Sequence, residues 1–532
     1  MKYKISTFSN SLIKLIGIDK PTTGNYSLFQ LFPPHFFSLY LWGLKSLEST
    51  IHNTMQTIIN ITDTYTDSDN LIFIVTDVKS IQKELFSEAE MDYIKTFHKE
   101  HKQDTFLFNR LNNWQFVIFV DKEKNTDQRL ESFRGAGAKF KTIVNQHKIN
   151  NVVIVDTEEK PLEMLSFAEG LALSNYQFLK YKSDKTENLN SLNSILLFST
   201  QISQEDIDNC NIVIDATSKC RDMVNEPVAY MNAIKLAEEI EQMGKESGIK
   251  VEVLNKKKIE SLKMGGLLAV NKGSVDPPTF SIMEYKPENP INDKPYVFIG
   301  KGVVYDTGGM NIKTGNFMND MKCDMAGGAT IASAVYAIAR AKLPVHVIGL
   351  VPATDNRTNG NAYVSGDIIT MFDGTKVEVI NTDAEGRMLL ADALSYAKKY
   401  DPKLVIDVAT LTGSAMRAIG KYGIVSMQSG ADAEFKQLSK SGERVNERVV
   451  EFPFWKEYRE ELKSDIADIK HLSGADAGCI TAGKFLEHFT DYPYIHLDIA
   501  GPAFYDKPFK YYPSGGTGFG VRLLFNFIKN KK

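Results

Sequence analysis

Short apolar runs separated by polar stretches of helical spacing mark the first part of the chain. Residues 71–76, 114–120 and 151–155 are dense in β-branched and aromatic side chains and short enough to be buried strands. Residues 80–99 instead place apolar side chains at the spacing of a helix. Strands that alternate with helices in this way predict a smaller N-terminal α/β domain.

A polar stretch at residues 181–194 interrupts this pattern and loses its apolar periodicity. A long helical pattern follows over residues 204–224, and Pro227 ends it because proline disfavours helical conformation in the residue before it. A chain of 532 residues also exceeds the usual size of a single core. We therefore expect an N-terminal domain over residues 1–180, a linker over 181–204 and a larger domain over 205–532.

The second part of the chain has the stronger alternation. Its expected strands are residues 250–254, 280–285, 296–300, 345–351, 377–380, 404–408 and 494–499. Helical patterns separate several of them, at residues 233–246, 328–340 and 388–400. This order predicts a mixed-sheet α/β domain with helices on both faces of the sheet and ligands bound beyond the carboxyl ends of its strands.

Composition indicates the class of protein and its cellular compartment. Hydrophobic residues make up 43% and charged residues 24%, which excludes a wholly disordered chain, a collagen and a coiled-coil rod. The net charge of −4 argues against general binding to nucleic acid. None of the four cysteines has C-x-x-C spacing, and so few in this length favour a reducing compartment. With no long apolar run and no apolar leader segment, we expect a soluble, cytoplasmic protein without membrane contact.

Four carboxylates stand directly after expected strands or at the start of an expected helix: Asp306, Asp324, Asp383 and Glu385. If the four converge unpaired, their mutual repulsion is large, and two divalent cations would cancel it. Oxygen-rich ligand sets suit Mg²⁺, Mn²⁺ or Zn²⁺. No histidine falls in these segments, so the H-E-x-x-H arrangement of many zinc enzymes is absent from them.

Three basic residues accompany the acids: Lys301, Lys313 and Arg387. Two nearby cations would lower the pKa of a lysine, so a neutral Lys301 could ligate a metal. Lys313 and Arg387 would stay positive and could stabilise an oxyanion or hold an anion. Taken singly, each acid could instead be a helix cap or a surface ion pair, but the joint pattern favours a site.

Residues 381–387 read Asn-Thr-Asp-Ala-Glu-Gly-Arg and resemble the signature of the leucyl aminopeptidase (cytosol aminopeptidase) family of dinuclear metallopeptidases. Four residues stand ahead of this segment at the family's spacing: Lys301, Asp306, Lys313 and Asp324. Further similar segments are residues 220–227, 267–270, 409–413, 495–501 and 516–522. The resemblance covers roughly residues 205–530 and is highly specific.

The resemblance implies a metal-dependent aminopeptidase that hydrolyses N-terminal, leucine-like residues from peptides by means of a water held between two metals. One metal would be bound by Lys301, Asp306, Asp324 and Glu385. The other would be bound by Asp306, Asp383 and Glu385. The ions would be Zn²⁺ or Mn²⁺, with Mg²⁺ or Co²⁺ as alternatives, because carboxylate sites exchange such ions according to supply.

The remaining roles also come from the resemblance, position by position. Lys313 would polarise the scissile carbonyl, and Arg387 would hold a bicarbonate that acts as general base. The side-chain pocket would be lined by Met321, Asn381, Ala384, Thr410 and Gly413, with the Leu411 carbonyl accepting a substrate N–H. The mostly apolar lining fits a leucine-like side chain. Family members are homohexamers, so a homohexamer is expected.

Two positions depart from the family pattern, although neither is a ligand. Thr307 stands where serine is commoner, and Ser365 stands where proline is commoner. Two other functions are compatible with parts of this pattern. A dinuclear phosphoesterase would also need clustered carboxylates, but such sites usually add histidines. A DNA-binding role, which some relatives combine with peptidase activity, is disfavoured by the net charge of −4.

Overall fold

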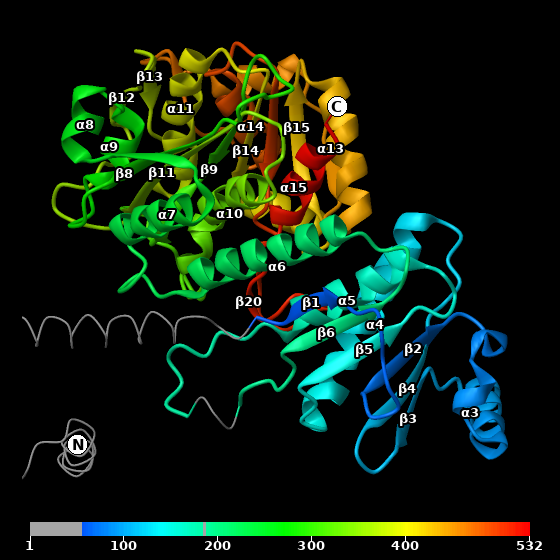
Figure 1. Ribbon diagram of the computed structural model, residues 1–532. Helices are drawn as coiled ribbons and strands as arrows, with labels where there is room; N and C mark the ends of the chain where they lie inside the picture. Colours follow the sequence, from blue (N-terminus) through cyan, green and yellow to red (C-terminus); the bar gives the residue numbers. More distant parts are fainter. Residues whose placement is uncertain (1–55, 185–187, 532) are drawn as a thin grey trace, which may run out of the picture. The chain divides into compact units, whose positions relative to one another are not determined.

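Two large sheets organise the part of the chain that the computed structural model describes, residues 56–184 and 188–531 (Figure 1). No helix within these ranges is long and apolar enough to cross a membrane. The expectation that the chain lacks an apolar leader concerns a segment outside the described residues.

The first sheet has six strands in the order β1-β6-β5-β2-β4-β3. Their bounds are β1 Ile58–Ile61, β2 Leu71–Val75, β3 Thr105–Asn109, β4 Trp114–Phe119, β5 Asn151–Val155 and β6 Ser194–Phe198. Neighbouring strands are parallel except β3, which pairs antiparallel with β4. The three strands expected from the apolar runs are confirmed as β2, β4 and β5.

Alternate residues of β2 reach opposite faces of this sheet, as the two-residue period of a strand requires. Ile72 and Ile74 belong to the core that includes α4 (Thr126–Gln146) and α5 (Pro161–Asn175). Leu71 and Phe73 belong to a second core with α3 (Glu88–His101). The helical spacing expected over residues 80–99 is divided between two short 3-10 turns and α3, because a capping box formed by Ser87 and Glu90 starts the helix there.

Helices α4 and α5 approach each other closely because a glycine of each faces the backbone of the other. A Cβ atom on Gly137 would lie 2.1 Å from the Phe167 carbonyl oxygen. A Cβ atom on Gly170 would lie 2.1 Å from the Arg134 carbonyl oxygen. The pair therefore depends on the absence of side chains at both positions.

Helix α6 (Gln204–Asn225) leads from the first sheet toward the second (Figure 1). It begins where the Ser203 hydroxyl accepts a hydrogen bond from the Asp206 N–H, and it ends two residues before Pro227. Strand β6 falls within the segment expected as a linker and pairs with β1 and β5. Its five residues follow a polar stretch and give too short a signal to identify a strand.

The second sheet has nine strands in the order β16-β15-β18-β14-β9-β11-β8-β7, with β10 paired to β11. Their bounds are β7 Lys250–Leu254, β8 Thr279–Tyr285, β9 Tyr296–Gly300, β10 Gly302–Asp306, β11 Val347–Asn356, β14 Leu404–Ala409, β15 Ile424–Ser429, β16 Val449–Glu451 and β18 Tyr494–Asp498. The central strands β18, β14, β9 and β11 are parallel, whereas β7, β8 and β15 pair antiparallel with their inner neighbours. The expected two-domain α/β fold with a larger mixed sheet is confirmed.

Helices cover both faces of the second sheet, as expected (Figure 1). Those on one face are α7 (Ala233–Ser247), α10 (Ala326–Arg340) and α15 (Val521–Lys529), and those on the other are α9 (Gly265–Asn271), α11 (Gly386–Ala397) and α14 (Gly478–Glu487). Tyr296 and Phe298 of β9 belong to the core on the α10 face. Val297 and Ile299 belong to the core on the α11 face.

Residues 377–380 do not extend this sheet. Strand β13 (Lys376–Glu378) pairs with β12 (Ile368–Thr370) and β17 (Ile469–Lys470) in a separate three-stranded sheet. The expectation that residues 377–380 belong to the main sheet is wrong. A short apolar run indicates a buried strand but does not identify the strand with which it pairs.

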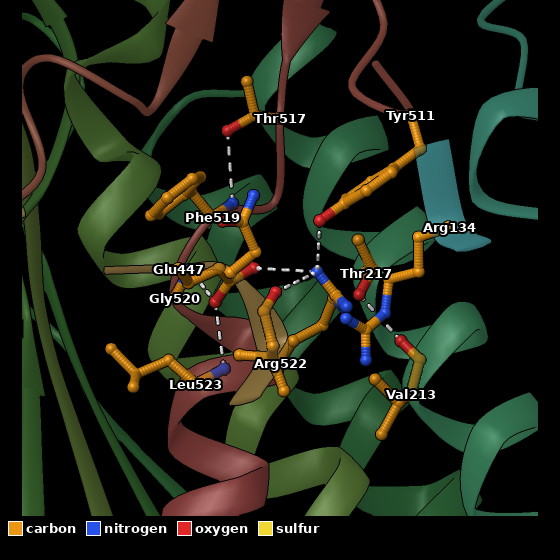
Figure 2. A network of polar contacts seen from close by, with 12 residues as sticks. Arg134, Val213, Thr217, Glu447, Tyr511, Thr517, Phe519, Gly520, Arg522 and Leu523 are labelled. Atoms are coloured by element: carbon orange, nitrogen blue, oxygen red, sulfur yellow. Dashed lines mark hydrogen bonds and ion pairs between the residues drawn. The ribbon is translucent and has the colours of Figure 1, made fainter. Parts of the chain in front are cut away.

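Four charged residues, which we call the interdomain network, join the helices of the two sheets: Arg134, Glu169, Glu447 and Arg522. Arg134 of α4 and Arg522 of α15 both donate through Nε to Glu169 of α5, at 2.6 and 2.9 Å. Figure 2 shows Arg522 directed toward Glu447 and Tyr511, with Arg134 beside it. Glu447 Oε2 accepts the backbone N–H groups of Gly520 and Leu523, both at 2.9 Å.

The two acids of this network have opposite pKa shifts. Burial raises the pKa of Glu169, but Arg522 and Arg134 lower it further, and the pKa falls to about 2. Glu447 has a weaker partner, since Arg522 Nη1 lies 3.9 Å from its Oε1. Burial therefore dominates and raises the pKa of Glu447 to about 7.

Candidate metal centre

The site forms where central strands of the second sheet end. Lys301 directly follows β9, and Asp306 is the last residue of β10. Strand β14 neighbours β9 and is followed by Thr410. Because the carboxyl ends of parallel strands meet at one edge of the sheet, these three residues lie together.

Asp324 and Glu385 reach the same edge from two 3-10 turns. Turn η4 (Met321–Met325) places Asp324 just before α10, and η5 (Thr382–Ala384) places Glu385 just before α11. A glycine behind each turn leaves room for Lys301. A Cβ atom on Gly386 would lie 2.6 Å from Lys301 Nζ, and one on Gly327 would lie 2.9 Å from the Lys301 backbone nitrogen.

Three carboxylates converge at this edge: Asp306, Asp324 and Glu385. One oxygen atom of each lies within 4.8 Å of the others, and none of the three residues is more than 4% exposed. Burial, followed by the negative charge of Glu385, raises the pKa of Asp306 to about 7, and burial raises the pKa of Asp324 well above its usual range. A divalent cation would remove this cost, and carboxylate oxygens are the ligands that hard divalent cations prefer. The chemistry and charge of these three carboxylates therefore suit a bound divalent cation.

Lys301 lies among the same carboxylates. Its Nζ forms ion pairs with Asp324 at 2.8 Å and Glu385 at 2.9 Å, and it donates to the Thr410 carbonyl at 3.0 Å. Burial lowers the pKa of Lys301, but these carboxylates raise it further, so it stays above its ordinary value. An ammonium group and a metal ion would compete for Asp324 and Glu385, and ligation by a neutral Lys301 stays a prediction.

Lys313 connects Asp383 to the cluster. Its Nζ lies 2.8 Å from Asp306 Oδ2 and 2.5 Å from Asp383 Oδ1. The Asp383 side chain is 33% exposed, so this pair stands at the open side of the buried carboxylates. Burial and the charge of Glu385 raise the pKa of Asp383. The structure thus brings all four predicted acids together, with two lysines between them.

Arg387 lies deeper, in the first turn of α11, and is 3% exposed. Its Nη1 donates to the His471 carbonyl at 2.7 Å. Its Nε is buried and has no hydrogen-bond partner among the described groups. Burial lowers the pKa of Arg387 to about 10. A buried guanidinium with an unused donor could hold a small anion.

The residues predicted to line a substrate pocket divide into two groups. Thr410 donates to Asp324 Oδ1 at 2.8 Å, the Asn381 side chain accepts the Asp383 N–H at 2.8 Å, and the Leu411 N–H donates to Asp498 at 3.2 Å. The others lie at the ends of elements beside the site: Met321 opens η4, Ala384 ends η5 and donates its N–H to the Asn381 carbonyl at 3.1 Å, and Gly413 opens α12 (Gly413–Ile419). Their roles toward a substrate stay predictions.

Two residues that the sequence analysis did not single out hold the segment with Asp383 in place. His471 contacts the Asn381 carbonyl through Nε2 at 2.9 Å and accepts the Ile380 N–H through Nδ1 at 3.1 Å. Asn356, the last residue of β11, donates to Asp306 Oδ1 at 2.8 Å. The polar run Thr-Asp-Asn-Arg, which follows the apolar part of β11, is the one local signal for Asn356, and His471 has no comparable signal.

Comparison with known proteins identifies the family. Residues 218–525 match the family described as the cytosol aminopeptidase family, catalytic domain. The chain belongs to the cytosol aminopeptidase family. It is 51% identical over 325 residues to a probable cytosol aminopeptidase of Chloroherpeton thalassium, with 60% of this chain and 63% of that protein covered. It therefore spans less than two thirds of the length of that relative.

A second cytosol aminopeptidase relative matches over a longer range. The probable cytosol aminopeptidase of Clostridium perfringens is 38% identical over 433 residues, with 79% of this chain and 87% of that protein covered. Among solved structures, the bottromycin maturation enzyme BotP in complex with Mn has a TM-score of 0.77 at 27% identity, covering 87% of this chain and 99% of that chain. A tomato leucine aminopeptidase mutant has a TM-score of 0.80 at 24% identity over 90% of this chain and 98% of that one, which concerns the fold alone.

Proposed function

We propose that this protein is a metal-dependent aminopeptidase that hydrolyses N-terminal, leucine-like residues from peptides. The observation that carries the proposal is the convergence of Asp306, Asp324 and Glu385 in a buried cluster beside Lys313. Family membership over residues 218–525 and the names of the relatives support the same activity.

Five residues would hold two divalent cations: Lys301, Asp306, Asp324, Asp383 and Glu385. Zn²⁺ or Mn²⁺ are the proposed ions, with Mg²⁺ or Co²⁺ as alternatives, and a related structure that contains Mn supports the class. When bound, the cations would lower the pKa of the attacking water and polarise the scissile carbonyl.

The chain's own basic residues would then complete the site. Lys313, at the open side of the cluster, would stabilise negative charge on the carbonyl oxygen of the substrate. Arg387 would hold a bicarbonate through its unused Nε, and the bicarbonate would accept a proton from the water. The proposed pocket for the first side chain is lined by Met321, Asn381, Ala384, Thr410 and Gly413, and the Leu411 carbonyl would accept a peptide N–H.

We also infer a cytoplasmic homohexamer. The family resemblance supports this assembly, and the names of the relatives as cytosol aminopeptidases support this compartment. Light scattering coupled to size-exclusion chromatography would test the assembly, because six copies and one copy differ sixfold in mass.

The activity is tested with purified protein, leucine anilide, a phosphate ester, and Mn²⁺ or Zn²⁺, each with and without a chelator. We expect release of the anilide that depends on the metal and stops with the chelator. Release of phosphate alone would instead support a dinuclear phosphoesterase and refute the peptidase.

A further inference from the structure

The side-chain amide of Asn356 makes two hydrogen bonds that join separate parts of the metal centre. It is 0% exposed and ends β11. Its Nδ2 donates to Asp306 Oδ1 at 2.8 Å and to the Thr382 carbonyl at 3.0 Å. One amide group therefore contacts a carboxylate of the cluster and the residue immediately before Asp383.

The orientation of this amide follows from its partners. Both neighbours, a carboxylate oxygen and a carbonyl oxygen, can only accept hydrogen bonds. Exchanging the oxygen and nitrogen of the side chain would place an acceptor against two acceptors. The nitrogen of Asn356 must therefore face the metal centre.

The contact determines which oxygen of Asp306 faces the open side of the site. Oδ1 accepts two neutral donors, Asn356 Nδ2 and the Gly308 N–H, both at 2.8 Å. Oδ2 lies 2.8 Å from Lys313 Nζ, at the side where Asp383 also lies. Without Asn356, the carboxylate would lose one of the two donors that prevent it from rotating.

The other atom of the amide shows that this arrangement has a cost. Asn356 Oδ1 is buried and has no hydrogen-bond partner among the described groups. A Cβ atom on Gly309 would lie 2.7 Å from it, so the surrounding chain leaves little space there. A buried acceptor without a partner destabilises a fold, so the favourable contribution of this side chain lies in the contacts that its Nδ2 makes within the site.

We propose that Asn356 is a positioning residue of the metal centre, which holds Asp306 and the Thr382–Asp383 segment in the geometry that binds a divalent cation. This inference rests on the proposed function for the reaction, but its direct consequence is metal affinity. A hydrogen bond that orients a metal ligand typically changes metal affinity or activity roughly 10- to 100-fold when it is removed.

The test compares Asn356→Leu, which keeps the branching of the side chain and removes both hydrogen bonds, with Asn271→Leu as a matched control that adds the same two methyl groups. Asn271 is also buried, and its Nδ2 also donates to two acceptors, the Asp276 carbonyl at 2.8 Å and Thr354 Oγ1 at 3.1 Å. Isothermal titration with Mn²⁺ measures affinity, and circular dichroism monitors folding. We expect the affinity for Mn²⁺ to fall roughly 10- to 100-fold for Asn356→Leu and to stay unchanged for Asn271→Leu. In Asn356→Leu, the fall in kcat should be larger than any change in KM.

Unchanged Mn²⁺ affinity in folded Asn356→Leu, or an equal loss in Asn271→Leu, would overturn the inference. If Asn356→Leu does not fold, Asn356→Ala at low temperature gives the same comparison. Wild-type protein that binds Mn²⁺ but does not hydrolyse leucine anilide would refute the proposed function alone. Wild-type protein that hydrolyses it while Asn356→Leu binds Mn²⁺ normally would refute the role of Asn356 alone.

Discussion

The ammonium group of Lys301 and that of Lys313 each lie between two carboxylates of the site. Lys301 contacts Asp324 and Glu385, whereas Lys313 contacts Asp306 and Asp383. With all four acids ionised, the two lysines would leave two negative charges uncompensated in a largely buried volume. This imbalance, more than any single ligand, is the physical reason to expect bound cations there.

Glu385→Ala tests the most buried acid of the cluster. Glu385 is 1% exposed, and its removal takes away one partner of Lys301 and one proposed ligand of both metals. We expect leucine anilide hydrolysis to fall below detection while the circular dichroism spectrum is retained. Glu378→Ala is the control, because the Glu378 side chain accepts a hydrogen bond from the Ser464 hydroxyl, outside the cluster. Normal turnover in Glu385→Ala would place the reaction elsewhere.

Gly386→Ala tests the space that Lys301 occupies. The new methyl group would lie 2.3 Å from Lys301 Cε, so the lysine must move away from its two carboxylates. We expect kcat/KM to fall roughly 10- to 100-fold with little change in the melting temperature. Gly360→Ala, at an exposed position with no atom within 4 Å of the added Cβ, should leave both unchanged. An equal effect of the two variants would contradict this reading.

At the scale of elements, local pattern predicted strands but not their partners. The runs at β2, β5, β7 and β9 are dense enough in apolar residues to identify each strand from sequence. Short strands such as β1 and β6 lack that signal, and β13 was assigned to the wrong sheet because pairing is decided by distant residues. The same limit applies to the site: motif residues were found, whereas Asn356 acts through a contact 50 residues away. The domain bounds stay a prediction.

The α4–α5 pair offers a test within one helix. Gly137→Ala would place a methyl group 2.1 Å from the Phe167 carbonyl oxygen and force the helices apart. We expect it to lower the free energy of unfolding by about 1–3 kcal/mol in urea titration. Gly135→Ala, in the same helix, has open space around its Cβ and should raise that free energy by about 0.5–1 kcal/mol. Destabilisation by both would mean that flexibility of α4, and not its packing, is required.

At the scale of the whole molecule, the interdomain network combines two acids in different environments. Glu169 is stabilised in its charged form by two arginines, whereas burial disfavours the charged form of Glu447. Glu169 accepts hydrogen bonds from both Arg134 and Arg522. Glu447 Oε1, in contrast, is buried without a hydrogen-bond partner among the described groups. The two acids therefore contribute to stability in opposite pH ranges. Their effects can be separated by substitution, because each acid faces different backbone and side-chain groups.

The stabilities of Glu169→Gln and Glu447→Gln, each compared with the wild type, should change with pH in opposite directions. The pKa of Glu169 is lowered from 4.5 to about 2, so its contribution is present above pH 4.5 and lost as the pH falls toward 2. We expect Glu169→Gln to cost about 3 kcal/mol at neutral pH and progressively less below pH 4.5. The pKa of Glu447 is raised to about 7, so its contribution is present below pH 4.5 and lost as the pH rises through 7.

Melting temperatures of both variants and the wild type across this pH range provide the measurement. The melting temperature of Glu169→Gln should lie below that of the wild type at neutral pH, and the difference should shrink as the solution becomes acidic. Glu447→Gln should gain stability as the pH rises from 4.5 through 7. Parallel curves for the two variants would show that the network does not titrate as the contacts predict.

The contact between Arg522 and Glu169 also sets an order of events during translation. The two residues are 353 positions apart in the sequence. At about 5–20 residues per second, a ribosome needs on the order of 20–70 s to reach Arg522 after Glu169 is made. During that time Arg134 is the partner available to Glu169 within the first sheet and its helices. The second arginine reaches Glu169 only when α15, the last helix of the described chain, has been made and docks.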